Sequence, residues 1–304
     1  MIRILYMSDL HLEMERWRLA VPGWAAFLAG RRAIATHPTR GPLLSGPLLN
    51  GARPADLIVL AGDIHNGLRG IVYADQLAKF LRAPVVYVAG NHEFYHHDIT
   101  QLYPALHRAA AHTQGRVRFL ENTTASFTFS GQRLHVLGCT LWTDYALHGD
   151  AASGMAAAAR LLNDHVMIQN QGGPLPPAGL LSRHRESRFW LHAELARLHA
   201  ADPAAQTLIV THHAPTGAVL GTRTGAIAPA YASELLGEFT PHAPAAWIHG
   251  HTHFRHDSAA HNIRLASAPR GYVSRDGRAA LDYQPGMLEI WPRGAESPAP
   301  VFDR

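Results

Sequence analysis

Histidines, acidic residues and one asparagine recur in the sequence directly after short apolar runs. Carboxylate and neutral imidazole are common metal ligands, and imidazole is also an acid or base near neutral pH. The motifs are Asp9-Leu10-His11, Gly62-Asp63, Gly90-Asn91-His92-Glu93, Thr211-His212 and Gly250-His251-Thr252-His253. The candidate ligands within them are Asp9, His11, Asp63, Asn91, His212, His251 and His253.

These seven candidates comprise two carboxylates, four imidazoles and one amide. They are too many donors for one tetrahedral ion, and they suit two ions about 3.5–4 Å apart that share a bridging carboxylate and a solvent oxygen. The set contains no thiolate, which favours Mn, Zn or Fe over a soft metal without choosing among them. We therefore expect two divalent or trivalent metal ions as cofactors.

The apolar runs before the motifs must bring the candidates together. Each run is short, rich in aliphatic residues and bounded by turn residues, which is typical of a buried parallel strand. Sites in α/β folds lie beyond the carboxyl ends of such strands. In extended backbone, the spacing of two in Asp9/His11 and His251/His253 would point both side chains the same way. The predicted strands are 2–7, 56–61, 85–89, 207–211 and 245–248.

The remaining pattern predicts one domain over residues 1–304 with insertions at about 12–54 and 144–180. The first insertion is either a lid over the site or a surface loop. Further strands are expected at 116–120, 125–129, 134–138, 263–267 and 287–291, with a hairpin turn at Ser130-Gly131. Helices are expected near 24–35, 71–82, 99–112, 151–163 and 182–201, the last starting at Ser182.

Composition narrows the class of protein. The 304 residues are 47% hydrophobic and 16% charged, which fits a globular enzyme. Cys139 is the only cysteine, so neither an intrachain disulfide nor a cysteine zinc site is possible. The net charge of +4 comes without a Lys/Arg block, so we do not expect a nucleic-acid partner. With no signal-peptide pattern and no membrane-length apolar stretch, we expect a cytoplasmic protein without a membrane partner. Nothing in the sequence indicates an oligomeric state.

The five motifs, in this order between residues 9 and 253, resemble those of the calcineurin-like metallophosphoesterase family. The resemblance implies a four-layer α/β/β/α sandwich with the metals at its strand ends. It implies that Asp63 bridges both ions and also makes it a catalytic residue. The other ligands that it implies are Asp9, His11 and His253 for one ion, and Asn91, His212 and His251 for the second.

His92 is not a ligand in this resemblance; it protonates the leaving oxygen or stabilises the transferring phosphoryl group. A metal-bridging hydroxide would attack phosphorus in line, which agrees with ordinary acid–base chemistry. His213 is the alternative to His212 as ligand, and we favour His212 because it directly follows the strand. His213 would then line the site or contact substrate. Arg270 either binds the phosphate or lies in a surface turn.

Two other segments, Leu141-Trp142-Thr143-Asp144-Tyr145 and Leu161-Leu162-Asn163-Asp164, resemble recurring segments of a bacterial branch of this family. Asp144 and Asn163 either orient a loop on the substrate side or are simple capping residues beside a core tryptophan.

The resemblance implies a phosphoester hydrolase. Asn66-Gly67 occupies the place of the Asp-Arg-Gly of protein phosphatases, so we do not expect a protein phosphatase. The Asn-His-Glu variant and the adjacent His212-His213 favour a small phosphodiester substrate, similar to a cyclic nucleotide or a glycerophosphodiester. The alternatives are a phosphomonoesterase, a nucleotide pyrophosphatase, or an inactive metal-binding scaffold. Because every ligand position is filled, we favour a working enzyme.

Overall fold

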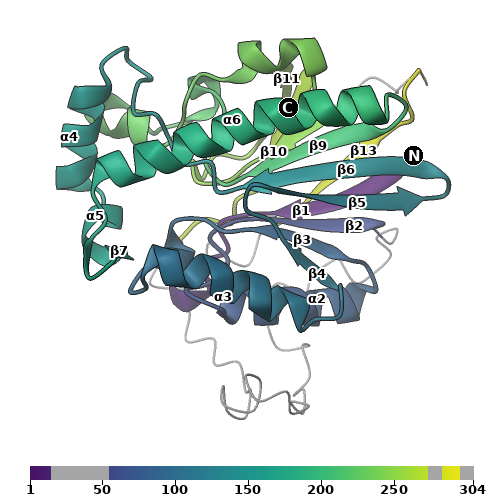
Figure 1. The fold of residues 1–304 in the computed structure, drawn as a ribbon, viewed down its shortest axis with the longest axis horizontal. Coiled ribbons are helices and arrows are strands. Elements are labelled where there is room, and N and C mark those ends of the chain that lie inside the picture. Colours follow the sequence, from purple (N-terminus) through teal and green to yellow (C-terminus); the bar gives the residue numbers. More distant parts are fainter. Residues whose placement is uncertain (15–54, 273–282, 295–304) are drawn as a thin grey trace.

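Two β-sheets lie face to face between two outer layers of helices (Figure 1). The computed structural model describes residues 1–14, 55–272 and 283–294. The expected four-layer α/β/β/α sandwich is confirmed. The predicted helix near 24–35 and the question of a lid over 12–54 fall almost entirely outside the described residues.

The first sheet carries three of the candidate motifs. Its parallel strands run in the order β1-β2-β3-β4, and β13 pairs antiparallel with β1 at one edge. Helices α2 and α3 cover its outer face (Figure 1). The bounds are β1 Ile2–Met7, β2 Leu57–Ala61, β3 Val85–Val88, β4 Val117–Phe119, β13 Gly286–Ile290, α2 Arg69–Leu81 and α3 Ile99–Ala111.

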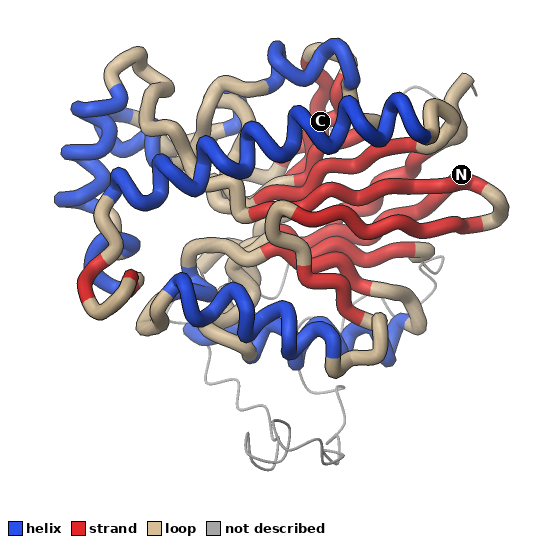
Figure 2. The backbone as a smooth tube through the Cα atoms, in the orientation of Figure 1, coloured by secondary structure: helices blue, strands red, loops and turns tan. Residues whose placement is uncertain are grey.

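The second sheet carries the other two motifs, in the order β11-β12-β10-β9-β6-β5. Strands β12, β10, β9 and β6 are parallel neighbours, and an antiparallel strand closes each edge. Helix α6 crosses its outer face (Figure 2). The bounds are β5 Thr123–Phe129, β6 Gln132–Cys139, β9 Gln206–Thr211, β10 Ala246–Ile248, β11 His256–Ala260, β12 Ile263–Ser267 and α6 Pro177–Ala201.

Three apolar cores lie between the four layers. Successive side chains along a strand point to opposite faces of the sheet, so one strand contributes to two of the cores. In β1, Ile4 and Tyr6 pack between the two sheets, whereas Leu5 and Met7 pack toward α2 and α3. A third core joins the second sheet to α6, for example through Ile209 and Leu191. A fully buried aliphatic side chain stabilises a fold by about 1.5–3 kcal/mol, so these cores hold the strand ends firmly in place.

The 144–180 insertion contains small elements beside the strand ends. These are α4 Ala151–Leu161, α5 Asp164–Met167, β7 Gln169–Asn170 and β8 Gly173–Pro174. Short 3₁₀ turns occur elsewhere, at η1 Leu12–Met14, η3 His92–Phe94, η4 Gly217–Val219, η5 Gly225–Ala230 and η6 Leu236–His242. Within the described part of the chain, no helix is both long and apolar enough to cross a bilayer.

The predicted strands are all present, with ends shifted by no more than two residues. The turn at Ser130-Gly131 is confirmed, since φ is +50° and +80° at its two residues, as a two-residue hairpin requires. The predicted start of α6 at Ser182 is wrong, because the helix begins at Pro177, where the fixed φ of proline suits a first helical position.

Strand β11 was not predicted, because its sequence His256–Ala260 lacks β-branched and aromatic residues. It forms through pairing with β12 across a tight turn at His261 and Asn262, both of which have positive φ.

Candidate metal centre

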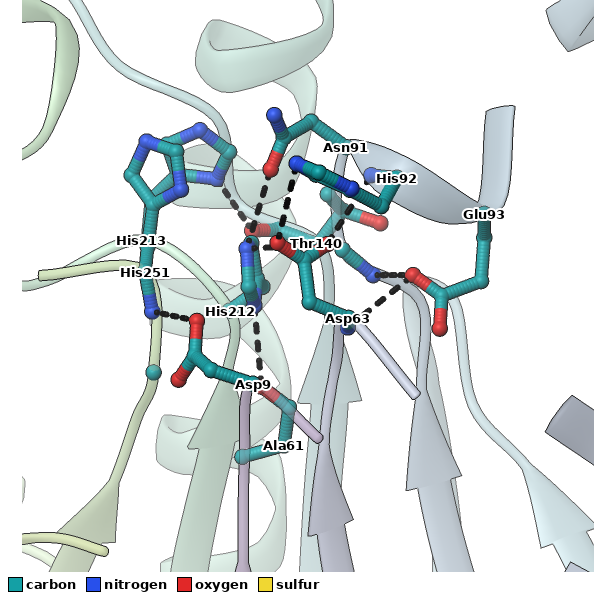
Figure 3. A network of polar contacts seen from close by, with 12 residues as sticks. Asp9, Ala61, Asp63, Asn91, His92, Glu93, Thr140, His212, His213 and His251 are labelled. Carbon is teal, nitrogen blue, oxygen red and sulfur yellow. Dashed lines mark hydrogen bonds and ion pairs between the residues drawn. The ribbon is translucent and has the colours of Figure 1, made fainter. Parts of the chain in front are cut away.

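The carboxyl ends of β1, β2, β3, β9 and β10 meet at one end of the two sheets, and all seven candidate ligands converge there. Figure 3 shows five of them, Asp9, Asp63, Asn91, His212 and His251. Within the described residues, three groups of side chains have ligand atoms close enough to hold an ion, with every pair of atoms in a group within 4.8 Å. One of them, His11, Glu13 and His92, contains a single predicted ligand, and the other two contain only predicted ligands. We call the two groups made only of predicted ligands cluster A (Asp9, His11 and His253) and cluster B (Asp63, His212 and His251).

In cluster A, two imidazoles and a carboxylate face one another. His11 Nε2 lies 3.0 Å from His253 Nε2, and His253 Nε2 lies 3.4 Å from Asp9 Oδ1. Asp9 and His11 are fully buried. The cluster joins the end of β1 in the first sheet to the loop after β10 in the second sheet.

In cluster B, the His212 ring lies among oxygen atoms. Its Nε2 is 3.1 Å from Asn91 Oδ1 and 3.4 Å from Asp63 Oδ1 (Figure 3). The His251 ring is 4.9 Å from that of His212. Asn91 therefore adjoins this cluster, to which the family resemblance assigns it as a ligand.

Asp63 lies between the two clusters. Its Oδ1 faces His212, whereas its Oδ2 is 3.7 Å from His11 Nε2 in cluster A. The backbone N–H of His92 also donates to Asp63 Oδ1 at 2.9 Å. One carboxylate thus presents an oxygen to each cluster, which is the arrangement that a bridging ligand needs.

Hydrogen bonding at the remote ring nitrogens leaves lone pairs facing the centre. His212 Nδ1 lies 2.9 Å from the Ala61 carbonyl and donates to it, so in a neutral ring Nε2 is an acceptor that faces the acceptor Asn91 Oδ1. His11 Nδ1 likewise donates to Glu13 at 3.1 Å, which turns its Nε2 toward His253. Facing acceptors of this kind are stabilised by a metal cation between them or by a proton on one ring nitrogen.

Among the buried side-chain atoms of the described residues that have no hydrogen-bond partner, two belong to candidate ligands, Asp9 Oδ2 and His251 Nε2. Leaving buried polar atoms unsatisfied costs about 1–3 kcal/mol each. Bound cations would satisfy both of these ligand atoms. The residues present therefore fit a pair of oxygen- and nitrogen-liganded metal ions.

The electrostatics of the centre also favour positive charge. Burial lowers the pKa of His212, but the carboxylates of Asp63 and Asp9 raise it to about 10. Burial and the adjacent His213 and His212 hold the pKa of His251 well below its usual value, so that ring is neutral and able to bind a metal. Protons or metal cations compete for the same positions.

Five of the candidate ligands have left-handed backbone, with φ of +51° at Asp9, +46° at His11, +55° at Asp63, +67° at His251 and +54° at His253. The sequence argument that extended backbone aligns each pair is therefore wrong. The side chains converge because the chain turns sharply at each ligand. Positive φ is uncommon outside glycine and is concentrated at functional sites.

His92 lies beside both clusters without belonging to either. Its Nε2 is 3.9 Å from Asp63 Oδ2 and 3.4 Å from the Tyr272 hydroxyl, and its ring packs on Tyr95 with centroids 4.3 Å apart. Burial lowers its pKa, but the charges of Asp63 and Glu13 raise it to about 9. In this geometry Nε2 holds a proton toward the centre.

Sequence reasoning missed the role of Glu13. One oxygen of its carboxylate, Oε1, accepts from His11 Nδ1 at 3.1 Å and from His92 Nδ1 at 2.9 Å. Glu13 thus fixes the orientation of a candidate ligand and of the candidate acid together. The only sequence signal is its position two residues after His11.

Glu93 is a second carboxylate whose role was not predicted. It is fully buried, and its Oε2 accepts the backbone N–H groups of Asp63 at 3.0 Å and Gly90 at 2.7 Å (Figure 3). Its Oε1 accepts from Ile64 N at 2.7 Å and from the Tyr87 hydroxyl at 2.6 Å. It ties the loop after β2 to the loop after β3, which positions Asp63.

His213 and Arg270, the predicted substrate contacts, are both largely buried. The His213 ring packs 4.1 Å from the His251 ring and donates from Nδ1 to the Thr140 carbonyl at 3.2 Å. Arg270 Nη1 donates to the Leu10 carbonyl at 3.0 Å, between the two cluster A residues that follow β1. Their contact with substrate stays a prediction.

The chain is similar in sequence to one protein family and in fold to several solved structures. The family model described as calcineurin-like phosphoesterase matches residues 2–255. The structure of the phosphopantetheinyl hydrolase PptH from Mycobacterium tuberculosis is 18% identical, with a TM-score of 0.64 over 97% of this chain and 98% of that chain. The structure of TT1561 from Thermus thermophilus is 14% identical, with a TM-score of 0.48 over 94% of this chain and 98% of that one. No curated protein matches the sequence.

Proposed function

The chain belongs to the calcineurin-like phosphoesterase family, and from this premise we propose that it hydrolyses a small phosphodiester at a two-metal centre. Membership of this family identifies the protein as a phosphoester hydrolase. The observation that carries the two-metal proposal is the carboxylate of Asp63, which offers one oxygen to each cluster of donors.

We propose that each cluster holds one ion, with Asp63 bridging. The donors would be Asp9, His11 and His253 in cluster A, and His212, His251 and Asn91 in cluster B. Oxygen and imidazole donors without thiolate suit Mn, Zn or Fe. Bound divalent or trivalent ions would supply Lewis acidity toward phosphoryl oxygens and water.

His92 would act as the acid. Its Nδ1 is held by Glu13 at 2.9 Å, so its protonated Nε2 is directed toward the centre, where the leaving oxygen of the ester would depart. The packing of its ring on Tyr95 limits rotation. Proton delivery of this kind contributes about 10²–10⁴-fold to rate.

The substrate proposal is a small phosphodiester, with His213 and Arg270 as candidate contacts. The Asp-Arg-Gly motif of protein phosphatases is absent, which argues against a phosphoprotein substrate. In its place, Asn66 donates from Nδ2 to the His92 carbonyl at 2.6 Å. The name of the Mycobacterium tuberculosis neighbour adds phosphopantetheinyl esters to the substrates worth testing. Phosphomonoesters and nucleotide pyrophosphates are the alternatives. A cytoplasmic location and the absence of a nucleic-acid partner stay predictions.

A substrate panel on metal-reconstituted protein tests the proposal. The panel contains a bis-aryl phosphate diester, an aryl phosphate monoester, a cyclic nucleotide, a glycerophosphodiester, a nucleotide pyrophosphate and a phosphopantetheinyl ester. We expect the highest kcat/KM on a diester, and none after chelation. Faster monoester or pyrophosphate hydrolysis would replace the diester proposal. Two bound ions without turnover would favour the scaffold.

A further inference from the structure

Asp164 is a buried carboxylate that no sequence argument had assigned. It is the first residue of α5, in the 144–180 insertion, and only 2% of its surface is exposed. It ends the Leu161-Leu162-Asn163-Asp164 segment, in which Asn163 was expected either to orient a loop on the substrate side or to be a capping residue. Asn163 precedes α5 without a side-chain capping hydrogen bond.

The Asp164 side chain points away from its own helix and into the candidate metal centre. Its Oδ1 accepts from Asn91 Nδ2 at 2.8 Å and from the Tyr95 hydroxyl at 2.7 Å. Asn91 Nδ2 also lies 3.0 Å from the Tyr95 oxygen. All three residues are buried, so water competes little for these bonds.

These contacts decide which end of the Asn91 amide faces cluster B. The amide nitrogen is held by Asp164, so the amide oxygen must point the other way, where it lies 3.1 Å from His212 Nε2. The two ends of an amide have nearly the same shape but opposite chemistry, because only the oxygen has lone pairs for a cation. A flipped Asn91 would present N–H groups to the ion.

We propose that Asp164 is a positioning residue that keeps the Asn91 oxygen toward the ion in cluster B. The inference rests on the proposed two-metal function, since it assigns the partner of one of its ligands. Through Tyr95, the same carboxylate also stabilises the ring on which His92 packs. The insertion after residue 144 thus supplies a part of the centre that the five motifs lack.

Metal titration of the metal-free protein tests this role without relying on activity. We expect wild-type protein to bind two Mn²⁺ ions by calorimetry, and Asp164→Leu to bind one of them about 10–100-fold more weakly, the usual loss when a ligand's hydrogen-bond partner is removed. Asn163→Ala is the matched control at the same helix start, and we expect wild-type affinities for both ions.

A charge exchange separates positioning from a general structural effect. Asn91→Asp alone would set two carboxylates against each other at a distance of about 2.8 Å, so we expect metal binding at cluster B to weaken. Adding Asp164→Asn gives the exchanged pair, in which the new amide donates to the new carboxylate. We expect the double variant to regain at least 10-fold in affinity over Asn91→Asp, even if Asp164→Leu does not fold.

Two results would overturn the inference alone: a folded Asp164→Leu that binds both ions like wild type, or an exchanged pair that regains no affinity over Asn91→Asp. If wild-type protein binds fewer than two ions, the two-metal proposal fails and this inference fails with it. The wild-type titration therefore tells the two failures apart.

Discussion

At the scale of single residues, the centre depends on side chains that orient other side chains. Glu13, Glu93 and Asp164 are not among the predicted ligands, yet each fixes a residue that is. Metal-bound imidazoles and amides commonly have such partners, which set the tautomer and direction of the ligand. The positions of the candidate ligands therefore depend on carboxylates that hydrogen-bond to them on the side away from the centre.

Replacing Glu13 by alanine removes the shared acceptor of two imidazoles. His11 Nδ1 and His92 Nδ1 would both lose their partner, so both rings would rotate more freely. We expect about 10–100-fold weaker binding of the cluster A ion together with a lower kcat. Glu13→Gln keeps an acceptor oxygen and should lose less. Equal metal affinity in wild type and Glu13→Ala would contradict this role.

Replacing His92 by alanine should separate catalysis from metal binding. Because His92 Nε2 lies 3.9 Å from Asp63 and belongs to neither cluster, we expect two bound ions to remain while kcat falls by about 10²–10⁴-fold. Metal analysis and steady-state kinetics on the same sample measure both quantities. Loss of an ion in this variant would show that His92 is a ligand.

At the scale of elements, the ends of the strands bring the candidate ligands together, and sharp turns of the backbone orient their side chains. The strands could be predicted because their apolar runs are continuous, and the positions of the candidate ligands could be predicted because each one follows such a run. The left-handed backbone at Asp9 and His251 could not be predicted, since neither is a glycine. It is imposed by hydrogen bonds between loops, for example from Asp9 N to the Gly62 carbonyl at 3.0 Å.

Contacts distant in sequence explain what else was missed. Asn91 and Asp164 are 73 residues apart, and His92 and Glu13 are 79 apart. No local periodicity or spacing reports such pairs, because they form only when layers pack. The segment containing Asp164 was recognised as a resemblance, but nothing in the sequence singled out Asp164 within it.

Gly90 tests how tightly the loop after β3 is packed. A Cβ there would overlap Asp63 Oδ1 and lie 2.6 Å from the Asp63 backbone nitrogen and 2.7 Å from His212 Cε1. We expect Gly90→Ala to lose at least one ion and to destabilise the fold by about 1–3 kcal/mol, as overpacking does. Gly173→Ala is the control, because a Cβ there meets no atom within 4 Å. Full metal content in Gly90→Ala would disagree with the packing described.

At the scale of the whole molecule, the candidate ligands link the two sheets. Asp9, Asp63 and Asn91 come from the first sheet, whereas His212 and His251 come from the second. An ion bound in either cluster would therefore join the two halves of the sandwich. The carboxylates of Asp9 and Asp63 would repel each other when no cation or proton lies between them.

Metal removal should accordingly lower thermal stability. A ligand at 100 times its Kd stabilises a fold by about 2.7 kcal/mol, and two such ions would raise Tm by several degrees. Scanning calorimetry of chelated and reconstituted protein measures the shift. The His92→Ala variant should show the same shift as wild type, and an unchanged Tm on reconstitution of wild type would argue against ions that bridge the sheets.

The most direct test of the two-metal centre is the metal content of reconstituted wild-type protein beside that of Asp63→Asn. Asp63 faces both clusters, at 3.4 Å from His212 Nε2 and 3.7 Å from His11 Nε2, so its loss should affect both ions. Our account predicts two ions per wild-type chain and fewer than one in the variant. One ion in the wild type, or two in Asp63→Asn, would contradict it.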